Sequence, residues 1–313
     1  MEIIRYPHHT SLNSLNNSVT IGNFDGVHLG HQKLIEKVVN QAKITDGLAV
    51  VVTMQPLPVQ YFQGKHAVPL VTSFKQKVKL MVEQGVDVLC VLNFNKQLST
   101  MTALDFFNEI LVEGLKARYL LVGDDFQFGA NRAGDAAFLA LQCHQAQIKF
   151  EQQNSVLLNG RRVSSSLIRS ALAVGDFKQV KCYLGRDYVV AGRVAHGKKL
   201  GRTLGFPTLN IHFKNGETAL HGIFVVKVKI KSQWHEAVAS VGYNPTVKDS
   251  TKRLEVHVLD WSGEIYGQWI EVLFYKKLRN EVEFDGLSAL KAGILSDVKA
   301  ARKYFEENTG DLV

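Results

Sequence analysis

This sequence has few cysteines and no long apolar segment. Its three cysteines lie far apart in a chain of 313 residues, and none belongs to a Cys-x-x-Cys pair. This pattern argues against a disulfide framework and against a cysteine zinc site. The first residues lack the basic and apolar regions of a signal peptide, and no apolar run approaches the length of a membrane span. The sequence therefore predicts a cytoplasmic protein without a membrane partner.

A concentrated basic patch is also missing, although the net charge is +8. Residues 1–184 carry 18 Lys and Arg against 14 Asp and Glu, and residues 185–313 carry 19 against 15, so each half has a charge of +4. Nucleic-acid-binding proteins more often concentrate positive charge in a stripe or tail, and the sequence has no aromatic RNA-binding motif. Small anionic substrates in both halves account for the charge equally well, and we expect no nucleic acid partner.

The order of apolar segments predicts two domains with different sheets. The first half alternates strands with helical stretches, which is typical of a parallel sheet covered by helices. Beyond Gly185 the pattern changes to successive strands with glycine turns, which predict a small antiparallel barrel and then a last helix. The strands are expected over 48–53, 86–92, 120–122, 189–194, 223–230, 237–241, 254–259 and 269–274, and the later helices over 166–173, 177–183 and 287–307. We therefore expect an α/β protein with domains 1–184 and 185–313.

The most informative segment is the turn between the first apolar strand and the helix that follows it. It contains His28 and His31, together with Gly22, Gly26 and Gly30. A helix N-terminus carries unpaired N–H groups and the positive end of the helix dipole, and glycines let a phosphate approach the backbone closely. Two imidazoles can add hydrogen bonds to phosphate oxygens. We therefore expect transfer of a nucleotidyl group, in which an incoming phosphate attacks the α-phosphorus of a nucleoside triphosphate.

Two simpler interpretations of the histidines stay open. They can be capping residues of the helix, or half of a zinc site with Asp25 as the nearby third ligand. The glycine spacing favours phosphate binding over plain capping. It does not match Gly-x-Gly-x-x-Gly, which disfavours a dinucleotide-dependent dehydrogenase.

A second loop of the first half also suits ligand binding. It follows the strand predicted over 120–122 and contains Asp124, Asp125, Phe126 and Phe128. Loops that leave the carboxyl ends of parallel strands are where such sheets bind ligands. The alternative is that the two acids are ordinary solvated loop residues.

A third segment of the first half opens a predicted helix. Ser165 or Ser166 can cap this helix, and Arg169 lies one turn inside, from where it can reach a triphosphate. The alternative role of Arg169 is ordinary helix solubility. Combined with the two histidines, this segment is interpreted as a second phosphate-binding segment.

A glycine-rich segment of the second half begins like a Walker A loop and then departs from it. Lys199 stands where a magnesium-binding Ser or Thr is required, and Pro207 soon interrupts any helix. We interpret the segment as a different phosphate loop. Its expected contacts are Gly197, Lys198, Gly201 and Arg202. Thr208 and Asn210, which alternate on a strand, offer oxygen ligands to a hard cation.

Two predicted strands of the second half alternate between apolar and polar residues. In the first of them, the apolar residues from Phe224 to Ile230 alternate with Val225, Lys227, Lys229 and Lys231, which predicts one wet face. Glu255 and His257 share one face of a later strand, and its other face is apolar. A lone strand carboxylate is usually solvated, but apolar residues flank this one. Glu255 is therefore a candidate general base.

Five motifs occur in a fixed order along nearly the whole chain. They are Thr20-Ile-Gly-Asn-Phe-Asp-Gly-Val-His-Leu-Gly-His31, Gly123-Asp-Asp-Phe-Gln-Phe-Gly129, Ser164-Ser-Ser-Leu-Ile-Arg169, Gly201-Arg-Thr-Leu-Gly-Phe-Pro-Thr-Leu-Asn210 and Arg253-Leu-Glu-Val-His257. Together they resemble the bacterial bifunctional riboflavin kinase/FAD synthetase family. The resemblance implies an N-terminal nucleotidyltransferase-like α/β domain that adenylylates FMN to FAD, and a C-terminal β-barrel that phosphorylates riboflavin.

The resemblance also implies roles for individual residues. The ATP contacts of the first domain are Gly22, Asn23, Asp25, Gly26, His28, Gly30, His31, Ser165, Ser166 and Arg169. The implied flavin contacts are Asp125, Phe126 and Phe128 in the first domain and Gly205 and Phe206 in the second. Thr208 and Asn210 are expected to hold Mg²⁺ with ATP. Glu255 is expected to activate the ribityl hydroxyl for attack on the γ-phosphate.

The sequence departs from the family pattern at two positions. Met54-Gln-Pro-Leu-Pro58 stands where the family usually shows Pro-His-Pro, so a histidine contact is missing at Leu57. Ser166 occupies a position that is often threonine, but the hydroxyl is retained. Two alternatives stay open: a riboflavin kinase with a weak or regulatory N-terminal nucleotide-binding domain, and a flavin-sensing or basic RNA-binding protein without turnover.

Overall fold

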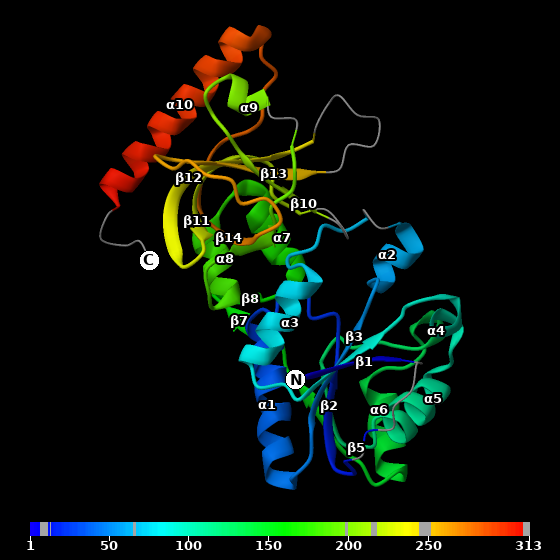
Figure 1. The fold of residues 1–313 in the computed structure, drawn as a ribbon. Coiled ribbons are helices and arrows are strands. Elements are labelled where there is room, and N and C mark those ends of the chain that lie inside the picture. Colours follow the sequence, from blue (N-terminus) through cyan, green and yellow to red (C-terminus); the bar gives the residue numbers. More distant parts are fainter. Residues whose placement is uncertain are drawn as a thin grey trace. The chain divides into compact units, whose positions relative to one another are not determined.

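The computed structural model describes residues 1–6, 12, 14–64, 67–197, 200–213, 218–243 and 252–308, without the side chains of Leu200 and Arg202. Contacts divide the chain into two compact units. The first comprises residues 1–68 and 74–165, and the second comprises residues 69–73 and 166–313. Figure 1 shows the helices and strands of both units. Helices α7 (Ser165–Val174) and α8 (Phe177–Leu184) therefore group almost entirely with the second unit.

The first unit contains a parallel sheet of six strands, as predicted. In spatial order they are β1 (Glu2–Tyr6), β4 (Val88–Leu92), β3 (Ala49–Met54), β2 (Asn17–Ile21), β5 (Ala117–Gly123) and β6 (Lys149–Gln153). The chain runs from β2 outward through β3 to β4, and then returns to β5 on the other side of β2. The order of strands thus reverses between β2 and β5. Open α/β sheets bind ligands at the carboxyl edge beside such a reversal.

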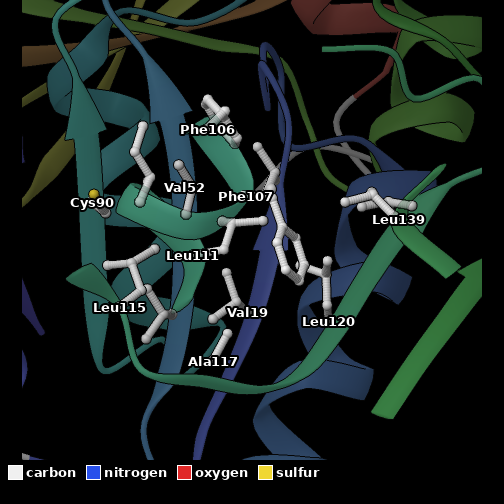
Figure 2. Close-up of a cluster of buried hydrophobic side chains, with 14 of the residues drawn as sticks. Val19, Val52, Cys90, Phe106, Phe107, Leu111, Leu115, Ala117, Leu120 and Leu139 are labelled. Atoms are coloured by element: carbon white, nitrogen blue, oxygen red, sulfur yellow. The ribbon is translucent and has the colours of Figure 1, made fainter. Parts of the chain in front are cut away.

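Helices cover both faces of this sheet. On one face, α1 (Leu29–Thr45) and α3 (Phe74–Glu83) pack through residues such as Ile35 and Met81. On the other face lie the π-helix η1 (Phe106–Gly114) and α6 (Ala136–Gln145), where Figure 2 shows Phe107, Leu120 and Leu139 in one apolar cluster. Each fully buried side chain of this size contributes about 1.5–3 kcal/mol. The remaining elements are α2 (Pro58–Gln63), α4 (Lys96–Thr100), α5 (Ala103–Asp105), η2 (Ala130–Arg132), β7 (Leu157–Leu158) and β8 (Arg161–Arg162).

The second unit contains an antiparallel sheet of six strands that is nearly closed into a barrel, as predicted. In spatial order the strands are β10 (Leu209–His212), β13 (Arg253–Val258), β12 (Gln233–Gly242), β11 (Gly222–Ile230), β14 (Trp269–Arg279) and β9 (Val189–Arg193). A bridge between Ala195 and Asn210 connects the two ends of this sheet. The short helix α9 (Leu200–Thr203) follows β9 in the sequence.

The last helix, α10 (Gly286–Glu307), covers the outside of β11 and β12. Its Ala301 and Phe305 pack against Val225 and Val238. The face of β11 that was predicted to be wet is therefore exposed only in part, because Val225 is buried beneath the helix. Within the described ranges, no helix has both the length and the apolar character needed to cross a membrane.

Candidate active sites

The loop between β2 and α1 lies at the carboxyl edge of the first sheet and has an unusual backbone. Phe24 and Val27 have positive φ angles of 47° and 42°. Such a conformation at a non-glycine residue costs about 1–3 kcal/mol, so other contacts must maintain it. Ser165 Oγ donates a hydrogen bond to the Asp25 carbonyl at 2.8 Å, and Gln32 Nε2 donates to the Val27 carbonyl at 2.8 Å. Side chains from outside the loop thus hold its carbonyl groups in place.

His28 and His31 lie together at the N-terminus of α1. Their imidazole rings stack with centroids 3.6 Å apart. His28 is the N-cap residue, and its Nδ1 accepts a hydrogen bond from the backbone N–H of His31 at 3.4 Å. Because Nδ1 is an acceptor, a neutral His28 ring carries its proton on Nε2 and is a donor there. A donor beside a helix N-terminus suits a phosphate.

The two simpler interpretations of the histidines fare differently. Capping is correct for His28, although this contact uses only one nitrogen of its ring. The zinc interpretation needs a third ligand. Over the described ranges, no group of three or more His, Cys, Asp or Glu side chains is placed to hold a metal ion.

Steric constraints within the loop explain why each of its three glycines is a glycine. A Cβ at Gly30 would lie 3.2 Å from the His28 ring, and a Cβ at Gly22 would lie 3.2 Å from the Phe24 ring. Gly26 has a φ of 88°, which only glycine adopts readily. Each glycine therefore shapes the loop, and contact of these residues with a phosphate stays a prediction.

Lys77 of α3 is a further residue of this site, which the sequence analysis did not identify. Its side chain is buried, and Nζ donates hydrogen bonds to the Asn23 carbonyl at 2.7 Å and to Thr53 Oγ1 at 3.4 Å. Burial lowers the pKa of Lys77 from 10.5 to about 8, and the charge of the nearby Asp25 partly opposes this effect. The side chain therefore remains mostly protonated at neutral pH. It adds a positive charge beneath the loop.

The loop after β5 lies at the same sheet edge and contains the predicted flavin contacts of the first unit. Phe126 stacks on Phe128 with ring centroids 5.4 Å apart, and Phe128 is buried against Phe106 of η1. Asp125 is exposed and forms an ion pair with Arg162 at 2.5 Å. Phe128 thus supports Phe126 from the core. The flavin roles of these residues stay predictions.

Asp124 connects this loop to the segment after β6. Its carboxylate accepts hydrogen bonds from the backbone N–H and the Oγ of Ser155, both at 2.8 Å. Partial desolvation acts to raise the pKa of Asp124, but the Ser155 hydrogen bonds and the Arg162 charge together hold that pKa below its usual range. Asp124 therefore remains ionised and fixes two loops of the sheet edge to each other.

Three aromatic side chains that the sequence analysis did not identify gather after β3 and β4. The ring centroids of Tyr61, Phe62 and Phe94 are 5.2–5.8 Å apart. Phe62 is 67% exposed. An aromatic cluster with two exposed rings at the carboxyl edge of the sheet suits stacking on a planar ring. Leu57, where the family usually has a histidine, is buried and is the N-cap residue of α2.

The predicted phosphate-binding residues Ser165, Ser166 and Arg169 are divided between the two units. Ser165 belongs to the first unit, where it holds the Asp25 carbonyl. Ser166 and Arg169 belong to the second unit, in which Arg169 Nε donates a hydrogen bond to the Pro69 carbonyl at 2.7 Å. The phosphate contacts of these three residues stay predictions.

Glu255 lies on β13, between β10 and β12 of the barrel. Its register partners are Asn210 on β10 and Ser240 on β12. The apolar residues on the other face of β13 are buried, as predicted. Burial raises the pKa of Glu255, Arg253 acts to lower it, and the charge of Glu281 raises it further. A carboxylate with a raised pKa is a stronger proton acceptor, as a general base requires.

Glu281 is a second carboxylate of this site, which the sequence analysis did not identify. Ser240 Oγ donates a hydrogen bond to Glu281 Oε1 at 3.1 Å, and His221 Nδ1 lies 3.6 Å from Glu281 Oε2. The carboxylate thus reaches the register partner of Glu255 on β12. Glu281 lies 26 residues after Glu255 in the sequence, so the local pattern around Glu255 gave no signal for it.

Thr208 and Asn210 lie together at the beginning of β10. Asn210 Nδ2 is 3.3 Å from the Thr208 carbonyl oxygen and 3.5 Å from Thr208 Oγ1. Asn210 Oδ1 is buried and has no hydrogen-bond partner among the described residues. Gly197 packs directly on this amide, because a Cβ there would come within 2.6 Å of Asn210 Nδ2. Amide and hydroxyl oxygens are ligands that Mg²⁺ accepts, so these residues fit such an ion.

Two glycines shape the turn before β10. The Gly201 carbonyl accepts a hydrogen bond from the Phe206 N–H at 2.7 Å, and a Cβ at Gly201 would clash with the Phe206 carbonyl oxygen. Gly205 has a φ of 90°. The turn brings Phe206 edge-on to His257, with ring centroids 5.3 Å apart. Two other predicted phosphate contacts lie outside the described part of the chain, namely Lys198 and the side chain of Arg202.

A hollow of about 280 Å³ adjoins Thr208 in the second unit. Its walls include Pro207, Trp261, Ile265 and Tyr266, and the sequence analysis named only Pro207 among them, as a residue that interrupts a helix. Two aromatic rings and a proline give this hollow flat apolar walls. Such walls suit a planar heterocycle placed beside the candidate cation ligands.

Comparisons with known proteins match two successive parts of the chain to two families. A family model described as FAD synthetase matches residues 11–167, and one described as riboflavin kinase matches residues 184–305. The bifunctional riboflavin kinase/FMN adenylyltransferase of Pseudomonas fluorescens is 40% identical over 303 residues, which is 96% of this chain and 97% of that protein. The protein of the same name from Haemophilus influenzae is 37% identical over 306 residues, which is 97% of this chain and 99% of that protein.

A solved structure supports the fold over the same length. The crystal structure of a Streptococcus pneumoniae protein described as a macrolide-efflux protein matches with a TM-score of 0.81 and 27% sequence identity, and covers 96% of this chain and 99% of that one. Both family models match in the expected order, and the relatives exceed 30% identity over nearly the full length. The chain therefore belongs to the family of bifunctional riboflavin kinase/FMN adenylyltransferases.

Proposed function

We propose that this chain converts riboflavin to FMN in its C-terminal domain and FMN to FAD in its N-terminal domain, with ATP as the second substrate of both reactions. The observation that supports the proposal is the presence of one candidate site in each unit. The first unit has two stacked imidazoles at a helix N-terminus. The second has a half-buried carboxylate with a raised pKa, in register with the candidate cation ligand Asn210. We place both reactions in the cytoplasm, where ATP is available.

In the proposed adenylyl transfer, a phosphate oxygen of FMN attacks the α-phosphorus of ATP, and pyrophosphate leaves. No group of the protein needs to form a covalent bond, so catalysis depends on positioning and on stabilising charge. His28 and His31 donate hydrogen bonds to the ATP phosphates at the positive end of α1. The partly exposed ring of Phe126 and the cluster of Tyr61, Phe62 and Phe94 are proposed to contact the planar flavin.

In the proposed kinase reaction, the terminal ribityl hydroxyl of riboflavin attacks the γ-phosphorus of ATP, and ADP leaves. Glu255 accepts the proton of that hydroxyl. Thr208 and Asn210 would hold Mg²⁺, which offsets the negative charge of the ATP phosphates when it is bound. Gly205 and Phe206 are proposed flavin contacts, and Gly197, Lys198, Gly201 and Arg202 are proposed phosphate contacts.

Product analysis tests the whole proposal. The full chain is incubated with riboflavin and Mg-ATP, and the flavins are separated by chromatography while pyrophosphate is measured. We expect FMN to accumulate first, followed by FAD and pyrophosphate. Formation of FMN alone would instead support a kinase with a regulatory N-terminal domain. Formation of neither product would contradict catalysis and favour a binding protein.

The proposed domains 1–184 and 185–313 can be tested by separate expression. Each length lies in the usual domain range, so we expect both pieces to fold. The C-terminal piece should make FMN, and the N-terminal piece should adenylylate supplied FMN without phosphorylating riboflavin. A C-terminal piece that folds and yet makes no FMN would contradict the assignment of the kinase to this domain.

The packing of α8 adds a prediction about where the second domain begins. The ring of Phe177 lies 5.6–6.3 Å from the rings of Tyr188, Phe224 and Phe274 in the barrel. A piece that starts at residue 185 loses this ring. Loss of a buried phenylalanine costs about 3–5 kcal/mol, so we expect residues 166–313 to unfold at a clearly higher urea concentration than residues 185–313. Equal midpoints would show that α7 and α8 do not stabilise the barrel.

A further inference from the structure

The beginning of the β2–α1 loop is held by two donors from different elements. Lys77 Nζ of α3 donates to the Asn23 carbonyl at 2.7 Å, and Thr53 Oγ1 at the end of β3 donates to the same carbonyl at 3.1 Å. Lys77 Nζ also lies 3.4 Å from Thr53 Oγ1. We call these three residues the Asn23 clamp. The clamp joins α3, β3 and the loop that leads to the two histidines.

The burial of the clamp indicates that its charge has a purpose beyond packing. Thr53 is 0% exposed and Lys77 is 6% exposed. Burying an ammonium group is unfavourable unless hydrogen bonds and nearby charges compensate for the lost water. One turn further along α3, the buried position is occupied by Met81, so an apolar side chain meets the packing needs of this helix face. The lysine supplies what methionine cannot, which is a charged donor aimed at a backbone carbonyl.

The position of the clamp explains what that donor does. The C=O and N–H groups of one peptide unit point in opposite directions, so fixing the Asn23 carbonyl also fixes the Phe24 N–H. Phe24 is the first of the two non-glycine residues with positive φ in the loop. The clamp therefore sets the direction in which the strained segment leaves β2. His28 caps α1 at the other end of that segment.

We propose that Lys77 is a positioning residue for adenylyl transfer, which acts through the Asn23 carbonyl to hold the loop that carries His28 and His31. This inference rests on the function proposed for the first unit. Lys77 donates to the backbone of the loop, so its proposed effect on the substrate is indirect. Its removal should therefore disturb the placement of the histidines while the protein remains folded and the barrel remains active.

The main test compares Lys77→Met with Lys79→Met in the full chain. Methionine keeps an unbranched side chain and removes the charge and the donors, and Lys79 is an exposed lysine of the same helix. A misplacement of catalytic groups by about 1 Å costs up to roughly a hundredfold in rate. For Lys77→Met we expect FAD formation to slow by about ten- to a hundredfold. Riboflavin phosphorylation should stay within about twofold of wild type, and Lys79→Met should change neither rate.

Two further measurements separate positioning from a loss of stability. Amide hydrogen exchange over residues 22–31 should become faster in Lys77→Met, while exchange in the strands of the first sheet stays unchanged. In Lys77→Ala, added n-propylammonium should restore part of the FAD formation, and n-propanol, which lacks the charge, should not. Thr53→Val removes the other donor from the same carbonyl, and we expect a smaller decrease in the same reaction. It serves as the test if the Lys77 variants do not fold.

The proposal is overturned if Lys77→Met forms FAD at the wild-type rate with unchanged exchange over residues 22–31, or if propanol restores activity as well as propylammonium does. These outcomes differ from a failure of the proposed function. If the wild-type chain itself forms no FAD from FMN and ATP, the adenylyltransferase assignment is wrong. The exchange measurement then still reports whether Lys77 holds the loop.

Discussion

Replacing both His28 and His31 by alanine is expected to abolish FAD formation, while FMN formation from riboflavin continues. Both rings lie at one helix N-terminus, stacked 3.6 Å apart, so they are placed to act on the same phosphate chain. Removing one donor that stabilises transition-state charge costs about 2–4 kcal/mol. The loss of two such donors should take the adenylyl transfer below detection. Chromatographic analysis of flavins formed from riboflavin and Mg-ATP measures both reactions in one experiment.

A second variant separates this chemistry from helix capping. In His28→Asn, the asparagine side chain can still accept the His31 N–H, but the imidazole is gone. Loss of an N-cap costs about 1 kcal/mol, so the free energy of unfolding should be lower for His28→Ala than for His28→Asn. Both single variants should lose FAD formation. His144→Ala, which removes an exposed histidine of α6, is the matched control. Unchanged FAD formation in the double alanine variant would contradict the phosphate role of these residues.

The parts of this site that the sequence predicts are the local ones. A strand, a glycine-rich turn and a helix with one apolar side follow one another within about 25 residues of chain, so the histidines were assigned to a helix N-terminus from spacing alone. The alternation along β13 likewise predicted which face Glu255 shares, because a strand places successive side chains on opposite faces. Both predictions depend only on the geometry of a single element.

The parts that the sequence did not predict depend on contacts between distant segments. Lys77 is 54 residues from Asn23, and Glu281 is 41 residues from Ser240. A weak signal existed for Lys77, since it lies on the same helical stripe as Phe74, Val78 and Met81, where an apolar residue is expected. The prediction that one face of β11 is wet was wrong at Val225, again because of a contact with a distant segment. The strand pattern alone does not tell that α10 will cover that end of the strand.

The fold positions each site by a feature that belongs to the whole sheet. In the first unit, the reversal of strand order between β2 and β5 brings together two loops that are about 100 residues apart in the sequence. In the second, antiparallel pairing of β10 with β13, which are about 40 residues apart in the sequence, places Asn210 opposite Glu255. Neither pairing has a local signal. Each follows once the topology is known, and each assembles a candidate site from segments that carry only part of its chemistry.

Glu255→Gln is expected to stop riboflavin phosphorylation without affecting the adenylylation of supplied FMN. Glutamine keeps the shape of the side chain and its place in β13, but it cannot accept a proton at neutral pH. General base catalysis contributes about a hundred- to ten-thousandfold, so the kinase rate should fall by at least about a hundredfold. The measurement follows FMN formed from riboflavin and Mg-ATP, and in a parallel reaction FAD formed from FMN and Mg-ATP.

Three further measurements test whether the loss of rate is due to proton transfer. Glu236→Gln changes an exposed carboxylate on the neighbouring strand β12 and should leave the kinase rate unchanged. Burial is the main cause of the raised pKa of Glu255, and Glu281→Gln removes a charge that adds to it, so the base should be weakened but kept, with a smaller decrease in rate. Thermal unfolding of Glu255→Gln should match wild type, because the barrel keeps its packing.

A kinase rate near wild type in Glu255→Gln would show that Glu255 is only a barrel residue. The roles proposed for Thr208 and Asn210, which lie beside Glu255 in the barrel, would then need a separate test by their own substitution.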